Sequence, residues 1–275
     1  MQIAYLKMHG AGNRILVVDE RVDNRPPPTP SDLRTIGNRS TGPGFDQLMW
    51  LGPGSTDAVH ASYRVFNADG SEVEQCGNGI RCIAWMLARD SEEQAFHFES
   101  LAGIVEARMV GSDRVTVNMG EPRFEPEMVP FVAENDAKIH DLDVNGEKYS
   151  VAVVSMGNPH CVIEVDDVDT TDVARLGAAI ERHPRFPERC NVGFMQLVSR
   201  NLIRLRVYER GVGETLACGT GACAAVVTAS RLGRVDQEVA VNLPGGQLVV
   251  SWRGPAEPVW LTGNVEFSSE GTIDL

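Results

Sequence analysis

The chain has 275 residues, of which 43% are hydrophobic and 23% charged, a composition typical of a globular protein with one large domain or two ordinary ones. Its net charge of −13 argues against a general nucleic-acid or anionic-membrane binder, because phosphate recognition needs a basic surface. No run is long enough for a membrane-spanning helix, and the stretch MQIAYLKMHGAGNRILVVD lacks the features of a secretory signal, so we expect a cytoplasmic protein.

Short runs rich in Val, Ile and aromatic residues, ended by Gly, Pro, Asn or Asp, predict that strands dominate the fold. In chain order, the expected strands are Ile3–Tyr5, Ile15–Asp19, Tyr63–Asn67, Ala95–Glu99, Gly103–Met109, Val115–Met119, Val151–Ser155, Cys161–Val165, Asn201–Tyr208, Val239–Val241, Gln247–Trp252 and Val259–Thr262.

Four helices are expected among these strands. Ser31–Gly37 follows the loop RPPPTP, and Ser31 is its expected N-cap. Thr171–Arg182 has the amphipathic pattern of a surface helix. The two long helices, Cys76–Arg89 and Cys218–Leu232, both contain alanine and both open with glycines.

The two long helices form an internal repeat. EQCGNGIRCIAWMLAR aligns without a gap on LACGTGACAAVVTASR, with Cys76 on Cys218, roughly half the chain apart, which indicates two similar lobes. Pro and Glu cluster in GEPRFEPEMVP, where we place the boundary. The expected lobes are residues 1–120, to which the strand 264–275 returns, and residues 121–263, with the active site in the cleft between them.

Each repeat places a cysteine at a helix N-terminus, where free N–H groups and partial positive charge gather. Such a position lowers a thiol pKa toward about 3.5–7.5 and offers a seat for a carboxylate. Proton transfer at a carbon next to a carboxylate needs these elements. The thiolate of Cys76 or Cys218 would remove the α-proton, the other thiol would protonate the opposite face, and N–H donors would stabilise the carbanion.

The cysteines and glycines of these motifs also occur in metal sites, dinucleotide-binding loops and redox switches. A zinc site is disfavoured because the chain has no CxxC or HxxxH, so we expect no metal. GTGACA also fits a dinucleotide fingerprint, but ten residues after Tyr208 separate it from the preceding strand. A redox switch built on a Cys76–Cys218 disulfide stays open. The remaining cysteines are expected to serve packing: Cys82, Cys161, Cys190 and Cys223.

Six motifs spread over nearly the whole chain resemble those of the diaminopimelate epimerase family, and two of them contain the paired cysteine turns: KMHGAGN, GFDQLM, FNADGSEVEQCGNGIRC, MGNPHCV, FPERCNVGFMQ and ERGVGETLACGTGACAA. The resemblance implies an α/β (α+β) fold of two similar lobes, each a β-barrel-like sheet around a central helix. It also implies a cytosolic, cofactor-independent homodimer that interconverts LL- and meso-2,6-diaminopimelate for lysine and peptidoglycan-precursor synthesis.

The resemblance also implies roles for particular residues. Cys76 and Cys218 are the acid/base thiols, and His160 and Glu209 set their pKa values. Backbone contacts to the reacting carboxylate come from the two helix starts, and polar side chains hold the rest of the substrate. The implied binding residues are Asn13, Gln47, Asn67, Gly77, Asn78, Asn158, Asn191, Glu209, Arg210, Gly219 and Thr220.

A proline or hydroxyproline racemase of the same fold is the alternative within this chemistry. Asn67 and the Glu209-Arg210 pair argue against it, because they suit a second charged end that proline lacks. The chain also departs from the family pattern at three places. Arg14-Ile15 replaces the usual Asp-Phe, Cys190 replaces an aliphatic residue, and Phe267 stands nearest to a missing C-terminal tyrosine at the expected dimer contact.

Overall fold

The computed structural model describes residues 2–73, 76–101 and 103–274. Glu74 and Gln75 of the first cysteine motif lie outside the described residues. The chain divides into two compact units, the first made of Met1–Asn118 with Thr262–Leu275 and the second of Met119–Leu261. Each unit is described by itself.

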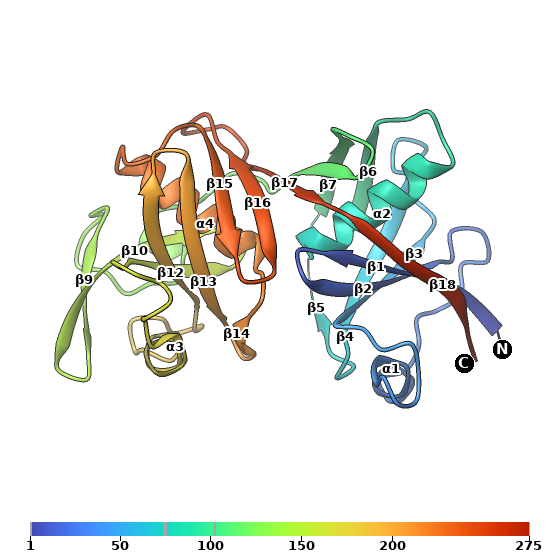
Figure 1. Ribbon diagram of the computed structural model, residues 1–275, viewed down its shortest axis with the longest axis horizontal. Coiled ribbons are helices and arrows are strands. Elements are labelled where there is room, and N and C mark those ends of the chain that lie inside the picture. The colour runs from blue at the N-terminus through green and yellow to red at the C-terminus, as the bar shows by residue number, and fades with distance from the viewer. Residues whose placement is uncertain (1, 74–75, 102, 275) are drawn as a thin grey trace. The chain divides into compact units, whose positions relative to one another are not determined.

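In the first unit a curved sheet surrounds one long helix (Figure 1). The central helix is α2 (Gly77–Arg89), and the short α1 (Pro30–Gly37) connects two parallel strands. The strands are β1 (Gln2–Gly10), β2 (Asn13–Asp19), β3 (Gln47–Gly52), β4 (Ala61–Asn67), β5 (Glu72–Val73), β6 (Ala95–Ser100), β7 (Gly103–Met109), β8 (Arg114–Asn118), β17 (Trp260–Asn264) and β18 (Glu266–Asp274).

The pairing of these strands brings the sheet back to where it began. The order is β18-β1-β2-β3-β4-β6-β7-β8-β17, with β2–β3 and β4–β6 parallel and β5 paired to the end of β4. Because β17 continues almost directly into β18, the sheet curls around α2, which contacts β1, β2, β3, β7 and β8. An antiparallel or mixed sheet closed in this way has few exposed edges.

The second unit has the same plan around helix α4 (Gly219–Arg231), which contacts β10, β11, β12, β13 and β16 (Figure 1). Its sheet order is β9-β10-β11-β12-β13-β15-β16, with β11–β12 and β13–β15 parallel. The elements are β9 (His140–Val144), β10 (Glu147–Ser155), β11 (Pro159–Glu164), β12 (Asn191–Ser199), β13 (Leu202–Glu209), β14 (Gly213–Thr215), β15 (Glu238–Leu243), β16 (Gly246–Ser251), α3 (Val173–Glu181) and the 3₁₀ helix η1 (Pro126–Met128).

Element by element, the second unit repeats the first. The parallel pair β11–β12 with its connecting α3 corresponds to β2–β3 with α1, and the hairpin β13–β14 before α4 corresponds to β4–β5 before α2. The predicted fold class, two similar α/β lobes each built around a central helix, is therefore confirmed.

The expected strands and long helices occur with ends shifted by a few residues. Strands β5, β9 and β14 were not expected, and three further details differ. The N-cap of α1 is Thr29 and not Ser31, because Pro30 occupies the first helical position and Thr29 forms a capping box with Asp32. Strands β3 and β12 were not predicted. QLMWLG has no β-branched residue, and NVGFMQLVS contains a glycine and a glutamine, so neither shows a clear strand pattern.

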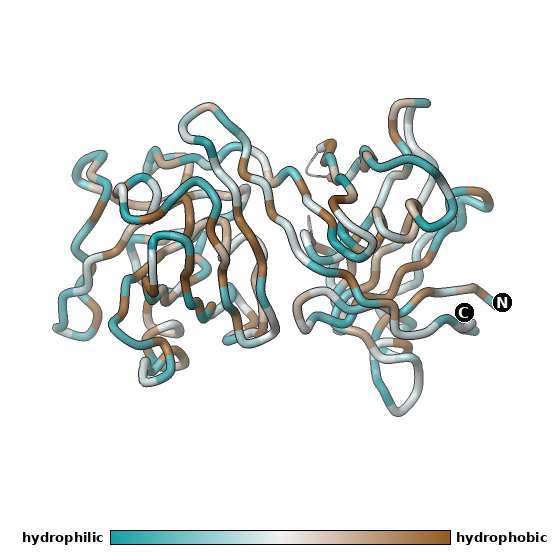
Figure 2. The backbone as a smooth tube through the Cα atoms, turned by 45° about the horizontal axis from the view of Figure 1, so that its top comes forward, coloured by the Kyte–Doolittle hydropathy of each residue, from teal (hydrophilic) through white to brown (hydrophobic). Residues whose placement is uncertain are grey.

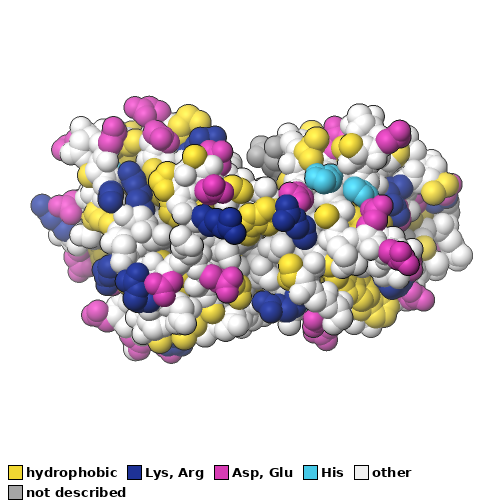
Figure 3. All heavy atoms as spheres, turned by 90° about the horizontal axis from the view of Figure 1, so that it is seen from above, with side chains coloured by type: hydrophobic (Ala, Val, Ile, Leu, Met, Phe, Trp, Pro, Cys, Tyr) yellow, Lys and Arg dark blue, Asp and Glu magenta, His cyan; other side chains and the backbone are white. Residues whose placement is uncertain are grey.

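Hydrophobic residues line the helices and strands of each unit while most loops are hydrophilic (Figure 2). In the second unit one core cluster includes Phe131, Phe186, Phe194 and Cys190, packed beneath α3. Acidic and basic side chains are interspersed over the face seen in Figure 3, without one large basic patch. None of the helices in the described part of the chain has the length and apolar composition needed to cross a bilayer.

Candidate active site

The first unit places Cys76 at the N-cap of α2. Its backbone is extended, with φ −142° and ψ 101°, and its side chain is 8% exposed. The N–H of Gly79 donates to Cys76 Sγ over 3.2 Å. Gly79 has no space for a side chain, because a Cβ there would lie 2.2 Å from the Sδ of Met49 on β3. The glycine therefore lets the first turn of α2 press directly onto the sheet.

A chain of amides runs along the strand ends next to this turn. Asn13 starts β2, Gln47 starts β3 and Asn67 ends β4. Asn13 Nδ2 donates to Gln47 Oε1 over 3.2 Å, and Gln47 Nε2 donates to Asn67 Oδ1 over 3.2 Å. Asn67 Nδ2 in turn donates to Ser71 Oγ over 3.0 Å. The structure thus brings three of the expected binding residues into one uncharged, half-buried row.

Asn78, in the first turn of α2, is held by a buried guanidinium. Arg81 is fully buried, and its Nη2 donates to Asn78 Oδ1 over 2.7 Å. A Cβ on Gly10, at the end of β1, would lie 3.4 Å from both Arg81 Nη2 and Asn78 Cβ. Gly10 pairs with Asn13 across the β1–β2 turn, so the helix start and the amide row are neighbours.

The second unit places Cys218 in the equivalent position, as the N-cap of α4 and 6% exposed. Its Sγ lies 3.6 Å from Thr220 Oγ1. Thr220 Oγ1 also accepts from Asn158 Nδ2 at 3.4 Å. Asn158 Oδ1 lies 2.9 Å from Nε2 of His160, which is 1% exposed. A polar chain therefore links the turn before β11 to the cysteine of α4.

A buried carboxylate, Glu209, lies near Cys218. Burial, and next the negative charge of Glu209, raise the pKa of the Cys218 thiol well above its ordinary value. Burial also raises the pKa of Glu209, which accepts a hydrogen bond from Thr215 Oγ1. The expectation that the helix N-terminus lowers the thiol pKa is therefore wrong for Cys218, because burial and a neighbouring carboxylate outweigh the helix dipole.

His160 is neutral in this environment. Burial, helped by the positive charge of Arg210, lowers its pKa from 6.5 to about 3. A neutral imidazole whose Nε2 faces the oxygen of Asn158 carries its proton on that nitrogen, because the oxygen can only accept. His160 therefore acts on Asn158 as a hydrogen-bond donor and brings no positive charge to the thiol.

Asn191 and Arg210 meet at the end of β13. Asn191 is 4% exposed, and its Nδ2 donates to Pro159 O over 3.2 Å. Its Oδ1 accepts from the backbone N–H of Arg210 over 2.9 Å. The exposed Arg210 side chain donates through Nη1 to Glu188 O over 3.1 Å. The fold thus presents a guanidinium one residue after Glu209.

The strand register shows that the two half-sites use equivalent positions. Ile15 pairs with Gln47, and His160 pairs with Asn191, each across a parallel strand pair. Two residues earlier stand Asn13 in the first unit and Asn158 in the second. By the same logic Gln47 matches Asn191, Asn67 matches Glu209, and Asn78 matches Thr220. At these matched positions the first unit therefore has only amides, whereas the second unit has the carboxylate of Glu209, followed by the guanidinium of Arg210.

The departures from the family pattern have local explanations. Arg14 forms an ion pair with Asp46 and also donates to it through its backbone N–H at 2.9 Å, so its charge is neutralised beside Gln47. Cys190 is buried in the core of the second unit, and its Sγ lies 3.8 Å from Ile180 O. Burial likewise raises the pKa values of three thiols expected to serve packing: Cys82, Cys161 and Cys190.

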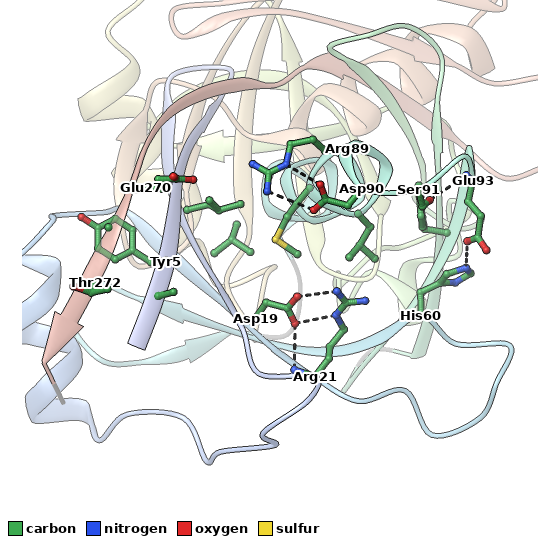
Figure 4. A pocket seen from close by; sticks show the side chains of 17 residues that line it. Tyr5, Asp19, Arg21, His60, Arg89, Asp90, Ser91, Glu93, Glu270 and Thr272 are labelled. Carbon is green, nitrogen blue, oxygen red and sulfur yellow. Dashed lines mark hydrogen bonds and ion pairs between the residues drawn. The ribbon is translucent and has the colours of Figure 1, made fainter. Parts of the chain in front are cut away.

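A pocket of about 750 Å³ in the first unit lies at the other end of α2, away from Cys76 (Figure 4). It contains none of the site residues expected from the sequence. Its charged side chains pair with one another, as Figure 4 shows: Arg21 with Asp19, Arg89 with Asp90, and His60 with Glu93. We therefore do not assign the chemistry of the cysteines to this pocket. Within the described residues, no three His, Cys, Asp or Glu side chains are grouped so as to hold a metal ion.

Three residues of the half-sites do not stand out in the sequence. Arg81 lies within the motif CGNGIRC, Thr215 lies in an expected loop, and Glu181 lies in a helix expected at the surface. Glu181 is in fact 1% exposed and accepts from the N–H of Gly211. A charged residue inside a cysteine-glycine motif was the available signal for Arg81, whereas nothing in the pattern marked Glu181 as buried.

Known proteins similar to this chain agree on one family. The sequence profile described as diaminopimelate epimerase matches residues 5–125 and 152–268. The chain is 49% identical over 282 residues to the diaminopimelate epimerase of Thioalkalivibrio sulfidiphilus and 47% identical over 277 residues to that of Ectopseudomonas mendocina, in both cases over 100% of each protein.

Solved structures extend the likeness at the level of the fold. A probable proline racemase from Agrobacterium radiobacter has a TM-score of 0.72 at 18% identity, and covers 99% of this chain and 93% of its own. A hydroxyproline epimerase from Agrobacterium vitis has a TM-score of 0.70 at 20% identity, with 100% and 93% covered. With its cysteine-capped helices and full-length relatives at nearly half identity, this chain belongs to the diaminopimelate epimerase family of isomerases.

Proposed function

We propose that this enzyme interconverts LL-2,6-diaminopimelate and meso-2,6-diaminopimelate, in the synthesis of lysine and peptidoglycan precursors. The full-length identity of 47–49% to named diaminopimelate epimerases carries the assignment. The repeated half-sites support it, because inversion at one carbon needs a proton acceptor on one face and a proton donor on the other, and a matched pair suits a reversible reaction.

In the proposed reaction Cys76 and Cys218 act on opposite faces of one α-carbon. The thiolate of one cysteine takes the α-proton, and the C–H electron pair moves onto the adjacent carboxylate. The thiol of the other cysteine then protonates the opposite face. The substrate leaves inverted, the thiol and the thiolate have exchanged roles, and the reverse reaction runs from that state. The reaction uses one thiolate and one thiol and consumes no cofactor.

The environment of Cys218 suggests which thiol starts as the acid. Its raised pKa, caused by burial and then by the charge of Glu209, favours the protonated form at neutral pH. A turnover that begins with Cys218 protonated requires the thiolate at Cys76. The Gly79 N–H, 3.2 Å from Cys76 Sγ, suits that role because it can donate to a negative sulfur.

The two helix starts are the proposed seat of the reacting carboxylate. The first backbone N–H groups of α2 belong to Gly77 and Asn78, and those of α4 to Gly219 and Thr220. Such groups have no partner within the helix and point along the positive end of its dipole. Donors of this kind stabilise the charge that develops on the carboxylate in the transition state.

The unreactive end of the substrate has one ammonium and one carboxylate, and the second unit offers partners for both. We propose that Arg210 binds the carboxylate, because a planar guanidinium can donate two parallel hydrogen bonds to it. Glu209 and the amide oxygens of Asn67 and Asn158 are the proposed ammonium acceptors. Gln47, Asn13 and Asn191 hold these groups in place through the hydrogen bonds described above.

One experiment tests reaction and substrate together. The reduced protein is mixed with LL-diaminopimelate in D2O without added cofactor and followed by NMR and chiral chromatography. We expect deuterium at the α-carbon together with the meso isomer. If reduced enzyme gives neither exchange nor meso product, the assignment fails.

The same tube distinguishes the alternatives. A proline or hydroxyproline racemase would exchange the α-proton of proline but not that of diaminopimelate; the structural likeness to such proteins, at 18–20% identity, concerns the fold only. A redox-switch protein would exchange the α-proton of neither substrate. Only its number of free thiols would differ between reducing and oxidising buffers.

We also propose that the enzyme is a cytoplasmic homodimer, as the family resemblance implies. The C-terminal strand β18 has an aromatic residue, Phe267, close to the position where the family pattern has a tyrosine. Phe267 is 41% exposed and stacks on Trp85 with ring centroids 6.2 Å apart. Light scattering of the purified protein tests the proposal, and Phe267→Asp should then shift the mass toward the monomer; a monomeric wild type would refute it.

A further inference from the structure

Glu181, the last residue of α3, is a carboxylate that the fold buries almost completely, with 1% of its side chain exposed. Carboxylates are seldom buried to this degree unless they have partners. Its Oε2 lies 3.1 Å from Arg182 Nε and its Oε1 3.6 Å from Arg189 Nη1. Oε1 also accepts from the backbone N–H of Gly211 over 2.9 Å. This last contact reaches the proposed substrate-binding turn, because Gly211 directly follows Arg210.

The turn at Arg210 is held by two buried acceptors in succession. The N–H of Arg210 donates to Asn191 Oδ1 over 2.9 Å, and the N–H of the next residue, Gly211, donates to Glu181 Oε1. Gly211 has a φ of +75°, a conformation that L side chains rarely adopt. The Glu181 carboxylate therefore stabilises the turn at Gly211, where the backbone has the left-handed conformation.

The first unit shows that this fold does not need the carboxylate. Gly37 ends α1 as Glu181 ends α3, and each lies ten residues before the matched Gln47 or Asn191, so Gly37 holds the place of Glu181. A Cβ on Gly37 would lie 3.0 Å from the Cβ of Ala68, which follows Asn67 as Arg210 follows Glu209. There the end of α1 packs directly on Ala68, which is uncharged where the second unit has Arg210.

We propose that Glu181 is a positioning residue that fixes the Arg210–Gly211 backbone so that the guanidinium of Arg210 meets the unreactive carboxylate of the substrate. The role rests on the proposed function, because it requires Arg210 to bind that carboxylate. Glu181 itself acts through Gly211 and does not contact the substrate. Its buried charge is offset by Arg182 and Arg189, whose side chains are 69% and 52% exposed.

Two conservative variants separate the length of the Glu181 side chain from its negative charge. Glu181→Gln keeps an oxygen at the length needed to accept from Gly211 and loses the charge. Glu181→Asp keeps the charge but is one methylene too short to reach the turn. We expect Glu181→Asp to raise the KM for diaminopimelate about tenfold with kcat changed less than about threefold, and Glu181→Gln to stay within about threefold of wild type in both.

A double-mutant cycle with Arg210→Ala tests whether the effect passes through the arginine. If Glu181 serves only to position that guanidinium, Glu181→Asp should cost about tenfold in kcat/KM in the wild-type background and almost nothing in Arg210→Ala. Arg182→Ala is the matched control, because it removes the partner of Oε2 and leaves the contact of Oε1 with Gly211. We expect it to change kcat/KM less than about twofold.

The outcomes separate this inference from the proposed function. Equal effects of Glu181→Asp and Glu181→Gln, or a full penalty of Glu181→Asp in the Arg210→Ala background, would show a merely structural role and overturn the inference. Wild-type protein that fails to exchange the α-proton of diaminopimelate would instead overturn the function. The thermal midpoint of each variant is measured beside the kinetics, and a lower midpoint with unchanged KM likewise counts against positioning.

Discussion

Inside the first turn of α2, Arg81 Nη2 donates to Asn78 Oδ1 over 2.7 Å, and the guanidinium is fully buried. This contact determines the orientation of an amide that would face the substrate. Because a guanidinium can only donate, it holds the oxygen of Asn78 and leaves the NH2 group as the free end. The equivalent position in α4 is Cys223, so the second half-site has no such cation.

We therefore expect Arg81→Met to lower kcat/KM for diaminopimelate by about 10- to 100-fold, since losing a hydrogen bond to a charged partner costs about 1.5–3 kcal/mol. Arg81→Lys should lose less, because it keeps a donor. Steady-state kinetics measure the effect. Arg89→Ala, at the far end of the same helix, is the control and should change kcat/KM less than about twofold. Wild-type kinetics in Arg81→Met would remove Arg81 from the orientation of Asn78.

Removing either thiol should abolish epimerisation. Cys76→Ala and Cys218→Ala each leave one face of the α-carbon without a proton acceptor or donor, so the D2O assay should show no meso product. A variant that keeps more than about a tenth of the rate, a loss under about 1.4 kcal/mol, contradicts the two-thiol mechanism. Cys190→Ala, in the core beneath α3, is the control and should cost stability of about 1 kcal/mol with activity retained.

The charge of Glu209 should govern the reactivity of Cys218. The carboxylate raises the pKa of this thiol after burial does, so Glu209→Gln should lower that pKa and increase the thiolate fraction at a given pH. We would follow iodoacetamide alkylation of Cys218 from pH 7 to 10 in a Cys76→Ala background. The alkylation rate at a given pH should increase when Glu209→Gln is added, because a larger fraction of the thiol is ionised. An unchanged alkylation rate would show that burial alone raises the pKa of the Cys218 thiol.

The neutral His160 should make the protein lose stability in acid. Its pKa is about 3 in the folded state against an ordinary 6.5, so the unfolded chain binds the proton first. The stability it contributes is complete above pH 6.5 and is lost as the pH falls toward 3. Urea unfolding at pH 7, 6 and 5 should show a free energy of unfolding that falls more steeply in wild type than in His160→Gln, by up to about 1.4 kcal/mol per pH unit. Equal slopes would mean that His160 is charged in the fold.

Much of this architecture could be predicted from the sequence because the repeat is strong. The pairing of Cys76 with Cys218, each followed by glycines and an alanine-rich helix, was sufficient to predict two similar lobes, and the family resemblance implied the central helices. Strands β3 and β12 escaped because their residues, such as Met49 and Gly193, are chosen for close packing against the central helix and neighbouring strands. Local propensity does not report such tertiary demands.

The structure brings expected site residues together within each unit, but the electrostatics around Cys218 differ from the expectation. A helix N-terminus lowers a thiol pKa, and this rule alone predicts an acidic Cys218. The pKa of Cys218 also depends on its burial and on its distance to Glu209. Both follow from the packing of β13 against α4. The same holds for Glu181, whose burial depends on a turn thirty residues later in the chain.

Equivalent glycines in the two helix starts should tolerate a methyl group to different degrees. A Cβ on Gly79 would lie 2.2 Å from the Sδ of Met49, whereas a Cβ on Gly221 would lie 3.0 Å from Val207 Cγ2 and 3.3 Å from Cys218 Sγ. The first contact forces a large displacement and the second only a small one. Overpacking of a tight core costs about 1–3 kcal/mol, so Gly79→Ala should lower the thermal midpoint more than Gly221→Ala.

A second-site change identifies the cause. Met49→Val removes the sulfur that the new methyl group of Gly79→Ala would meet, so the double variant should regain part of the thermal midpoint and of kcat/KM. Met49→Val alone measures the cost of the cavity, and Gly221→Ala with Met49→Val should show no rescue. If Gly79→Ala is as stable as wild type, or if Met49→Val worsens it additively, then the first turn of α2 is not pressed on β3 and the position of Cys76 has another origin.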